Sequence, residues 1–150
     1  PTGGQEQGYR RGTENLPAVI GFATALEAGF AWMENAVRLR KILEDAIVES
    51  GGVIIAPESN RLATIGSYRM PGVAASSQLI NFDMAGIAVS AGSACSSGTL
   101  KTSHVLGAMG WDGISASEVI RVSFGASTND DDIARFIDVW RSIAARAKAA

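Results

Sequence analysis

Near the C-terminus, the sequence Val119-Ile120-Arg121-Val122-Ser123-Phe124 alternates apolar and polar side chains from residue 120 onwards. This alternation predicts a half-buried β-strand, around which the rest of the fold can be placed. Successive side chains of a strand point to opposite faces of the sheet. Ile120, Val122 and Phe124 therefore fall on a buried face, whereas Arg121 and Ser123 fall on the other.

An amphipathic helix follows this strand. Thr128 is expected as its N-cap, and three aspartates at 130–132 fill the first turn, where the helix dipole favours negative charge. Its apolar stripe consists of Ile133, Phe136, Ile137, Trp140 and Ile143. A strand followed by such a helix predicts a sheet that is covered by helices.

The elements before the strand complete a small domain. Residues 53–56 and 62–68 predict a β-hairpin, and residues 87–89 predict a short strand. Helices are expected over 73–85 and 103–109, the first with an inward face of Val73, Leu79, Ile80 and Met84. The pattern predicts an α+β fold in which about four mostly antiparallel strands are covered by helices on one face.

The N-terminal part of the chain has a different organisation. Residues 1–15 contain four glycines and no regular period, which is typical of a loop. Asn15 can then cap a long helix over 16–50, in which Gly29 is the expected weak point. We therefore expect a loop at 1–15, a connecting helix at 16–50 and a small C-terminal domain at 51–150.

Composition narrows the possible functions. The chain has 150 residues, 47% of them hydrophobic, and a net charge of −2, so it has neither the basic surface typical of nucleic-acid binding nor the composition of a disordered segment. No apolar run approaches the roughly 18 residues of a membrane span. A single cysteine forms no internal disulfide and no cysteine-based zinc site, which favours a reducing, cytoplasmic setting.

Four residues could carry chemistry. Cys95 lies among small residues between Gly92 and Gly98, where it is either an accessible nucleophile or a small buried apolar side chain. Arg121 could bind a carboxylate in a cleft or form a structural ion pair. Thr13, within the glycine-rich opening, could meet a phosphate. His104 has no second ligand in view, so a structural role is the simpler interpretation.

These signals occur together in an order that resembles a known family. The matching stretches are Gly3-Gly4-Gln5-Glu6, Arg10 to Asn15, Gly92 to Gly98, Ser103 to Leu106, and Ile120 to Gly125. They resemble the C-terminal part of NifS-like cysteine desulfurases, pyridoxal-phosphate enzymes of the class V aminotransferase group. The resemblance implies the small domain of a fold-type I pyridoxal-phosphate enzyme.

The resemblance also implies a role for three residues. Cys95 would be the nucleophile that takes sulfur from L-cysteine and becomes a persulfide, leaving alanine. Arg121 would hold the carboxylate of the substrate. Thr13 would reach the cofactor phosphate of the other subunit in a homodimer. A sulfur acceptor, such as an iron–sulfur scaffold protein, would be the further partner.

The family's Schiff-base lysine is missing from this sequence. The three lysines are Lys41, Lys101 and Lys148, and none lies in the family's Ser-x-His-Lys context. We therefore expect a fragment that alone neither binds pyridoxal phosphate tightly nor turns over cysteine. A selenocysteine lyase-like class V enzyme and a non-catalytic sulfur-relay or dimerisation module remain as alternatives.

Overall fold

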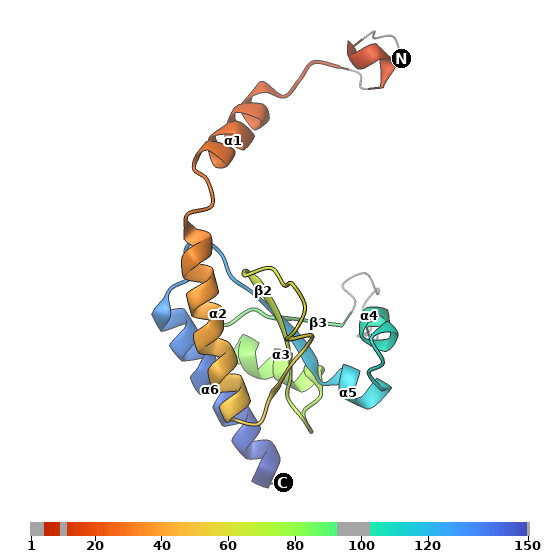
Figure 1. Cartoon of the computed structure of the whole chain (residues 1–150), viewed down its shortest axis with the longest axis vertical. Coiled ribbons are helices and arrows are strands. Elements are labelled where there is room, and N and C mark those ends of the chain that lie inside the picture. The colour runs from red at the N-terminus through yellow and green to blue at the C-terminus, as the bar shows by residue number, and fades with distance from the viewer. Residues whose placement is uncertain (1–4, 10–11, 93–102, 150) are drawn as a thin grey trace. The chain divides into compact units, whose positions relative to one another are not determined.

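The computed structural model describes residues 5–9, 12–92 and 103–149 (Figure 1). Within them the chain forms two compact units, residues 1–31 and residues 32–150. The first contains the 3-10 helix η1 (Gln5–Gly8) and the helix α1 (Leu16–Glu27). The second contains all the other elements: α2 (Trp32–Glu49), β1 (Val53–Ile54), β2 (Ile65–Arg69), α3 (Ala75–Met84), β3 (Ser90–Ala91), α4 (His104–Ala108), α5 (Gly113–Ser117), β4 (Val119–Ser123) and α6 (Asp130–Ala149).

The four strands form one sheet in the order β1-β2-β4-β3, and every neighbouring pair is antiparallel. The predicted α+β fold and the predicted hairpin are therefore confirmed. β4 is an inner strand, with β2 on one side and β3 on the other. The alternation predicted for it is also confirmed, since Ile120, Val122 and Phe124 are buried and Arg121 and Ser123 are exposed.

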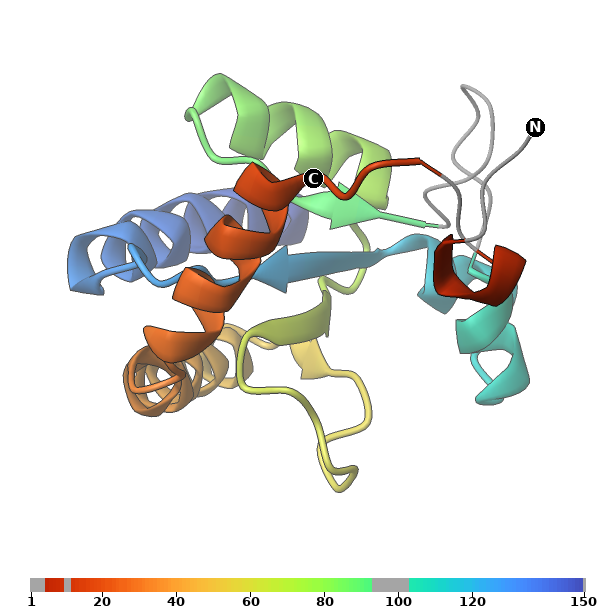
Figure 2. The same ribbon diagram turned by 90° about the horizontal axis from the view of Figure 1, so that it is seen from above.

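Three helices cover the buried face of the sheet. In Figures 1 and 2, α2 and α6 lie side by side and α3 lies next to α6. Tyr68 and Ile120 from the sheet join the same core cluster as Leu43 of α2, Phe82 of α3 and Trp140 of α6. The rings of Phe82 and Phe136 stack with their centroids 4.5 Å apart.

Two short helices cover one end of the opposite face. Val119, whose side chain points away from the main core, packs in a second cluster with Leu106 of α4, Ala116 of α5 and Ile55. The sequence did not predict α5. It begins at an N-cap, Asp112, whose carboxylate accepts hydrogen bonds from the backbone N–H groups of Ile114 and Ser115 at 2.9 and 3.0 Å.

The helix predicted over 16–50 is not continuous. It is interrupted between α1 and α2 at the expected weak point, where Gly29 adopts a left-handed backbone with φ of +69°. The boundary between the two compact units falls close to this interruption, after residue 31. Among the described residues, no helix is by itself long and apolar enough to cross a membrane, although α1 and α2 meet both criteria when taken together across their break.

Three local predictions were wrong in whole or in part. Of the inward face predicted for the helix over 73–85, Val73 is buried and Leu79 is half-buried, but Ile80 and Met84 are 62% and 83% exposed. The buried residues of α3 are Ala75, Gln78 and Phe82. The strand expected at 87–89 lies instead at Ser90–Ala91. The first turn of α6 is capped by Asn129: its side chain accepts from the N–H of Asp132, and Asp132 accepts from the N–H of Asn129, both at 3.1 Å.

Candidate active site

Arg121 lies near the middle of the sheet face that the large helices leave uncovered. It stands directly opposite Ser67 of β2 and Ser90 of β3 in the antiparallel register. Opposite residues in such a sheet project from the same face, so two small side chains flank the guanidinium. Arg121 is exposed, and no described residue forms a hydrogen bond or ion pair with its guanidinium.

A pocket of about 410 Å³ opens beside Arg121. Its walls come from the segment between β1 and β2, from α4 and from the sheet itself. Most of the lining is apolar, with Ile55, Leu62, Ile65, Val105, Leu106, Met109 and Val119. Arg121 therefore places a cation at the edge of an apolar pocket, where an anion loses less of its attraction to solvent screening than on an open surface.

Two other arginines near this face already have carboxylate partners. Arg61, which also lines the pocket, donates from both terminal nitrogens to Glu44, at 2.6 and 3.2 Å. This hydrogen bonding raises the pKa of Arg61 above its ordinary value. The Nε of Arg69 donates to Glu118 at 2.7 Å. Of these three arginines, Arg121 alone has no acidic partner among the described residues.

The stretch that carries Cys95 begins and ends at this pocket. Residues 93–102, Cys95 among them, lie outside the described residues, so the role of Cys95 stays a prediction. Gly92 and Ser103, the residues on either side of that stretch, both line the pocket together with Arg121. The described chain therefore reaches the pocket from both sides of the predicted nucleophile.

Two candidate residues remain, Thr13 and His104. Thr13 belongs to the first compact unit, between η1 and α1, and its proposed contact with a phosphate stays a prediction. His104 is the exposed first residue of α4 and does not line the pocket. The described residues contain no group of three or more His, Cys, Asp or Glu that could hold a metal ion.

Sequence reasoning missed Glu118 and Gln78, two polar residues that are buried beside β4. Glu118 is 7% exposed and Gln78 is fully buried. A glutamate directly before an apolar strand, with Arg69 at the end of another, was the available signal. It could not be used from the sequence alone, because 49 residues separate the two partners.

Comparisons with known proteins identify the family of the chain. The family model of aminotransferase class V matches residues 2–136, and the chain belongs to that family. Within the family it is similar to cysteine desulfurases. It is 37% identical to "Cysteine desulfurase IscS 1" of Archaeoglobus fulgidus, and 34% identical to "IscS-like cysteine desulfurase" of Mycobacterium tuberculosis.

These alignments cover nearly all of this chain but only part of each relative. They include 98% and 99% of the chain and 40% and 39% of the two relatives. A solved NifS-like protein from Rickettsia africae superimposes with a TM-score of 0.77 at 31% identity, over 95% of this chain and 38% of its own. The chain therefore spans about two fifths of the length of the relatives it matches.

Pyridoxal phosphate is the cofactor of this family. The described lysines do not fit the attachment of that cofactor at the pocket. Lys41 pairs with Asp45 on the exposed surface of α2 at 2.8 Å, and Lys148 donates to the backbone oxygen of Ser50 at 3.1 Å. Neither of the two described lysines therefore lies at the pocket that contains Arg121.

Proposed function

We propose that this chain forms the small domain of an L-cysteine desulfurase. Arg121 would bind the carboxylate of L-cysteine, and Cys95 would take the sulfur atom, which leaves alanine and a Cys95 persulfide. The observation that carries the proposal is the guanidinium of Arg121, which has no partner among the described residues and lines the same pocket as Gly92 and Ser103, the residues on either side of the Cys95 stretch.

Covalent geometry allows these two residues to act on one substrate. Consecutive Cα atoms lie 3.8 Å apart, so the three peptide links from Gly92 to Cys95 span at most about 11 Å. Gly92 lines the same pocket as Arg121. A cysteine held by its carboxylate at Arg121 would thus lie within the reach of a thiol at position 95.

The proposed reaction moves one sulfur atom. The Cys95 thiolate attacks the sulfur of the substrate, an S–S bond forms, and the C–S bond of the substrate breaks. The electron pair of that bond goes to the former Cβ, which is protonated as alanine forms. Pyridoxal phosphate, when bound, accepts electrons from the substrate and makes its sulfur electrophilic. Arg121 orients the substrate, and the largely apolar lining of the pocket limits the access of water.

The rest of the enzyme would come from parts that this chain does not contain. We propose that a longer protein supplies the lysine for the cofactor and that it works as a homodimer, with Thr13 meeting the cofactor phosphate of the partner subunit. The persulfide would pass its sulfur to an acceptor protein, such as a scaffold for iron–sulfur clusters. A cytoplasmic location fits such a thiol-dependent transfer.

Two substitutions in the full-length enzyme test the proposal. Cys95→Ala should abolish sulfur transfer from L-cysteine to a protein acceptor, because no other cysteine lies in this chain. Arg121→Gln should raise KM for L-cysteine by roughly 10- to 100-fold, since a hydrogen-bonded charge pair is worth about 1.5–3 kcal/mol. Sulfur transfer at the original rate by Cys95→Ala would refute the proposed role of the thiol.

The 150-residue chain gives a second test. Without a suitable lysine it should neither bind pyridoxal phosphate tightly nor release sulfide from L-cysteine. Absorbance of a stoichiometric lysine-bound cofactor on the purified chain would contradict the proposal that the cofactor site lies elsewhere in a longer protein.

A further inference from the structure

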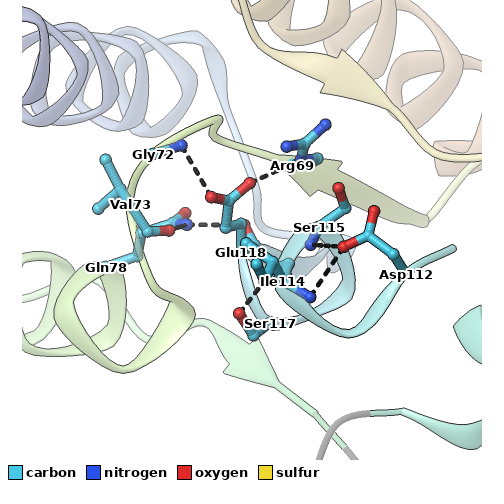
Figure 3. A network of polar contacts seen from close by, with 9 residues as sticks. All are labelled: Arg69, Gly72, Val73, Gln78, Asp112, Ile114, Ser115, Ser117 and Glu118. Atoms are coloured by element: carbon cyan, nitrogen blue, oxygen red, sulfur yellow. Dashed lines mark hydrogen bonds and ion pairs between the residues drawn. The ribbon is translucent and has the colours of Figure 1, made fainter.

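Glu118 is a buried carboxylate that holds two parts of the second unit together. It lies between the end of α5 and the first residue of β4, and it is 7% exposed. One carboxylate oxygen accepts from Nε of Arg69 at 2.7 Å, and the other accepts from the backbone N–H of Gly72 at 2.9 Å (Figure 3). Both oxygens therefore have a donor from the region where β2 ends.

The backbone of Glu118 is held as firmly as its side chain. Its carbonyl oxygen accepts from the N–H of Met70 at 3.2 Å and from the side-chain amide of Gln78 at 2.8 Å. The same amide also donates to the carbonyl of Val73 at 2.8 Å (Figure 3). The start of β4 is thus fastened to the turn between β2 and α3 by hydrogen bonds to both the main chain and the side chain of one residue.

Arg69 extends this network to the wall of the pocket. Its guanidinium lies over the ring of Trp111, 6.0 Å from the centroid, and Trp111 follows α4 in the chain. Trp111 packs against the small cluster in which Leu106 of α4 contacts Val119 of β4. Leu106, Val119 and Arg121 all line the candidate pocket. The Arg69–Glu118 pair therefore connects the start of β4 with the segment after α4, and both β4 and α4 contribute residues to the lining of the pocket.

We propose that Glu118 and Arg69 are positioning residues that set the place of Arg121 relative to α4; this inference rests on the proposed function. Arg121 stands on β4, three residues after Glu118, which immediately precedes that strand; three extended residues span about 10 Å. A planar guanidinium binds a carboxylate productively only over a narrow range of directions. Fixing the start of β4 therefore fixes the direction from which Arg121 meets the substrate.

The Arg69–Glu118 ion pair also reduces the net positive charge next to Arg121. Arg69 and Arg121 project from the same face of neighbouring strands, because Arg69 stands opposite Val119 and Arg121 stands opposite Ser67. Glu118 neutralises Arg69, so Arg121 is left as the cation that an incoming carboxylate meets. Loss of Glu118 would leave the guanidinium of Arg69 without its carboxylate partner and would change the charge next to Arg121.

The test uses Glu118→Gln in the full-length enzyme with L-cysteine as substrate. The variant cannot accept from Arg69 and Gly72 at the same time, and its KM for L-cysteine should rise about 10-fold, since a misplacement of about 1 Å can cost up to about 100-fold. The inhibition constant of the product L-alanine should rise in parallel, because Arg121 would bind both carboxylates. The value of kcat should change by less than about 3-fold.

A second variant keeps the test decisive if Glu118→Gln does not fold. Gln78→Met has a similar volume and removes the amide that donates to the carbonyls of Glu118 and Val73 while leaving the Glu118 carboxylate intact, so it should raise KM in the same direction by about 3-fold. The matched control is Ile143→Val on α6, which lowers stability in the main core without touching the network. It should leave KM for L-cysteine and inhibition by L-alanine unchanged.

The outcomes separate this inference from the proposed function. If the wild-type enzyme releases no sulfur from L-cysteine, the proposed function fails, and the positioning role fails with it. If Arg121→Gln raises KM but the folded Glu118 and Gln78 variants leave it within 2-fold of wild type, only the positioning role is overturned. Equal rises in KM for these variants and for Ile143→Val would also overturn it, because general destabilisation would then suffice.

Discussion

Gly66 offers the sharpest test of how the sheet is packed behind the candidate site. It lies on β2, beside Ser67, and its place on the core face is filled by the ring of Tyr68. A Cβ atom at position 66 would lie 1.9 Å from Oη of Tyr68 and 2.2 Å from its Cζ. Non-bonded heavy atoms normally approach to about 3.5 Å, so Gly66→Ala must push the ring by more than about 1 Å.

The tyrosine has no room for such a movement. Its side chain is fully buried, and its hydroxyl donates to Glu44 at 3.3 Å. Burial raises the pKa of this hydroxyl well above its ordinary value, so it remains a donor over the whole working pH range. Overpacking costs about 1–3 kcal/mol, and losing a hydrogen bond to a charged acceptor costs about 1.5–3 kcal/mol. We expect Gly66→Ala to lower the free energy of unfolding by about 3–5 kcal/mol.

Thermal unfolding followed by far-ultraviolet circular dichroism measures this effect. At about 2–4 °C per kcal/mol for a chain of this size, the melting temperature should fall by roughly 6–20 °C. Gly107→Ala is the matched control, because Gly107 lies inside α4 with open space around it and alanine favours a helix. A melting temperature for Gly66→Ala within about 2 °C of wild type would refute the reasoning that the Tyr68 ring is fixed over position 66.

Two further predictions concern the ends of helices. Asn129→Ala should cost about 1 kcal/mol in urea unfolding because it removes the side-chain cap of α6, and Thr128→Ala should cost less; the reverse order would restore Thr128 as the cap. Hydrogen bonds from Ser115 hold the pKa of Asp112 below its ordinary value of 3.8, so its contribution to stability is present above that value and is lost as the pH falls through the lowered pKa. Melting temperatures should show Asp112→Asn to be less stable than wild type at about pH 6, with a difference that shrinks towards about pH 3; a constant difference would contradict this.

The sequence predicted the elements whose patterns are local. Strand β4 was predicted because its alternation of apolar and polar side chains is visible within one short segment, and α6 was predicted because its apolar stripe from Ile133 to Ile143 covers about three turns. The inward face of α3 was wrong because both Ile80 and Phe82 fit a helical period. The choice between them depends on contacts with a distant helix, where Phe82 stacks on Phe136.

The candidate site was predicted unevenly for a related reason. Arg121 was placed on the open face of β4 by strand alternation, and its role came from the resemblance to cysteine desulfurases. The pocket beside it could not be predicted, because its walls come from the segment between β1 and β2 and from α4, which are more than 40 residues apart in the sequence. Chain connectivity alone does not indicate which of these segments face each other.

The pairing of charges explains why one arginine among several is suited to bind substrate. From the sequence, Arg61, Arg69 and Arg121 are equivalent, since each is an arginine in or near a strand. In the folded chain Arg61 forms an ion pair with Glu44, and Arg69 forms an ion pair with Glu118. Both pairs are largely buried. An arginine that is already paired with a carboxylate binds a second carboxylate more weakly, because the first one offsets its charge and occupies part of its hydrogen-bond donors. Arg121, flanked by Ser67 and Ser90, has no such partner among the described residues, so the proposed binding of one carboxylate on this face would depend on the two glutamates as much as on Arg121 itself.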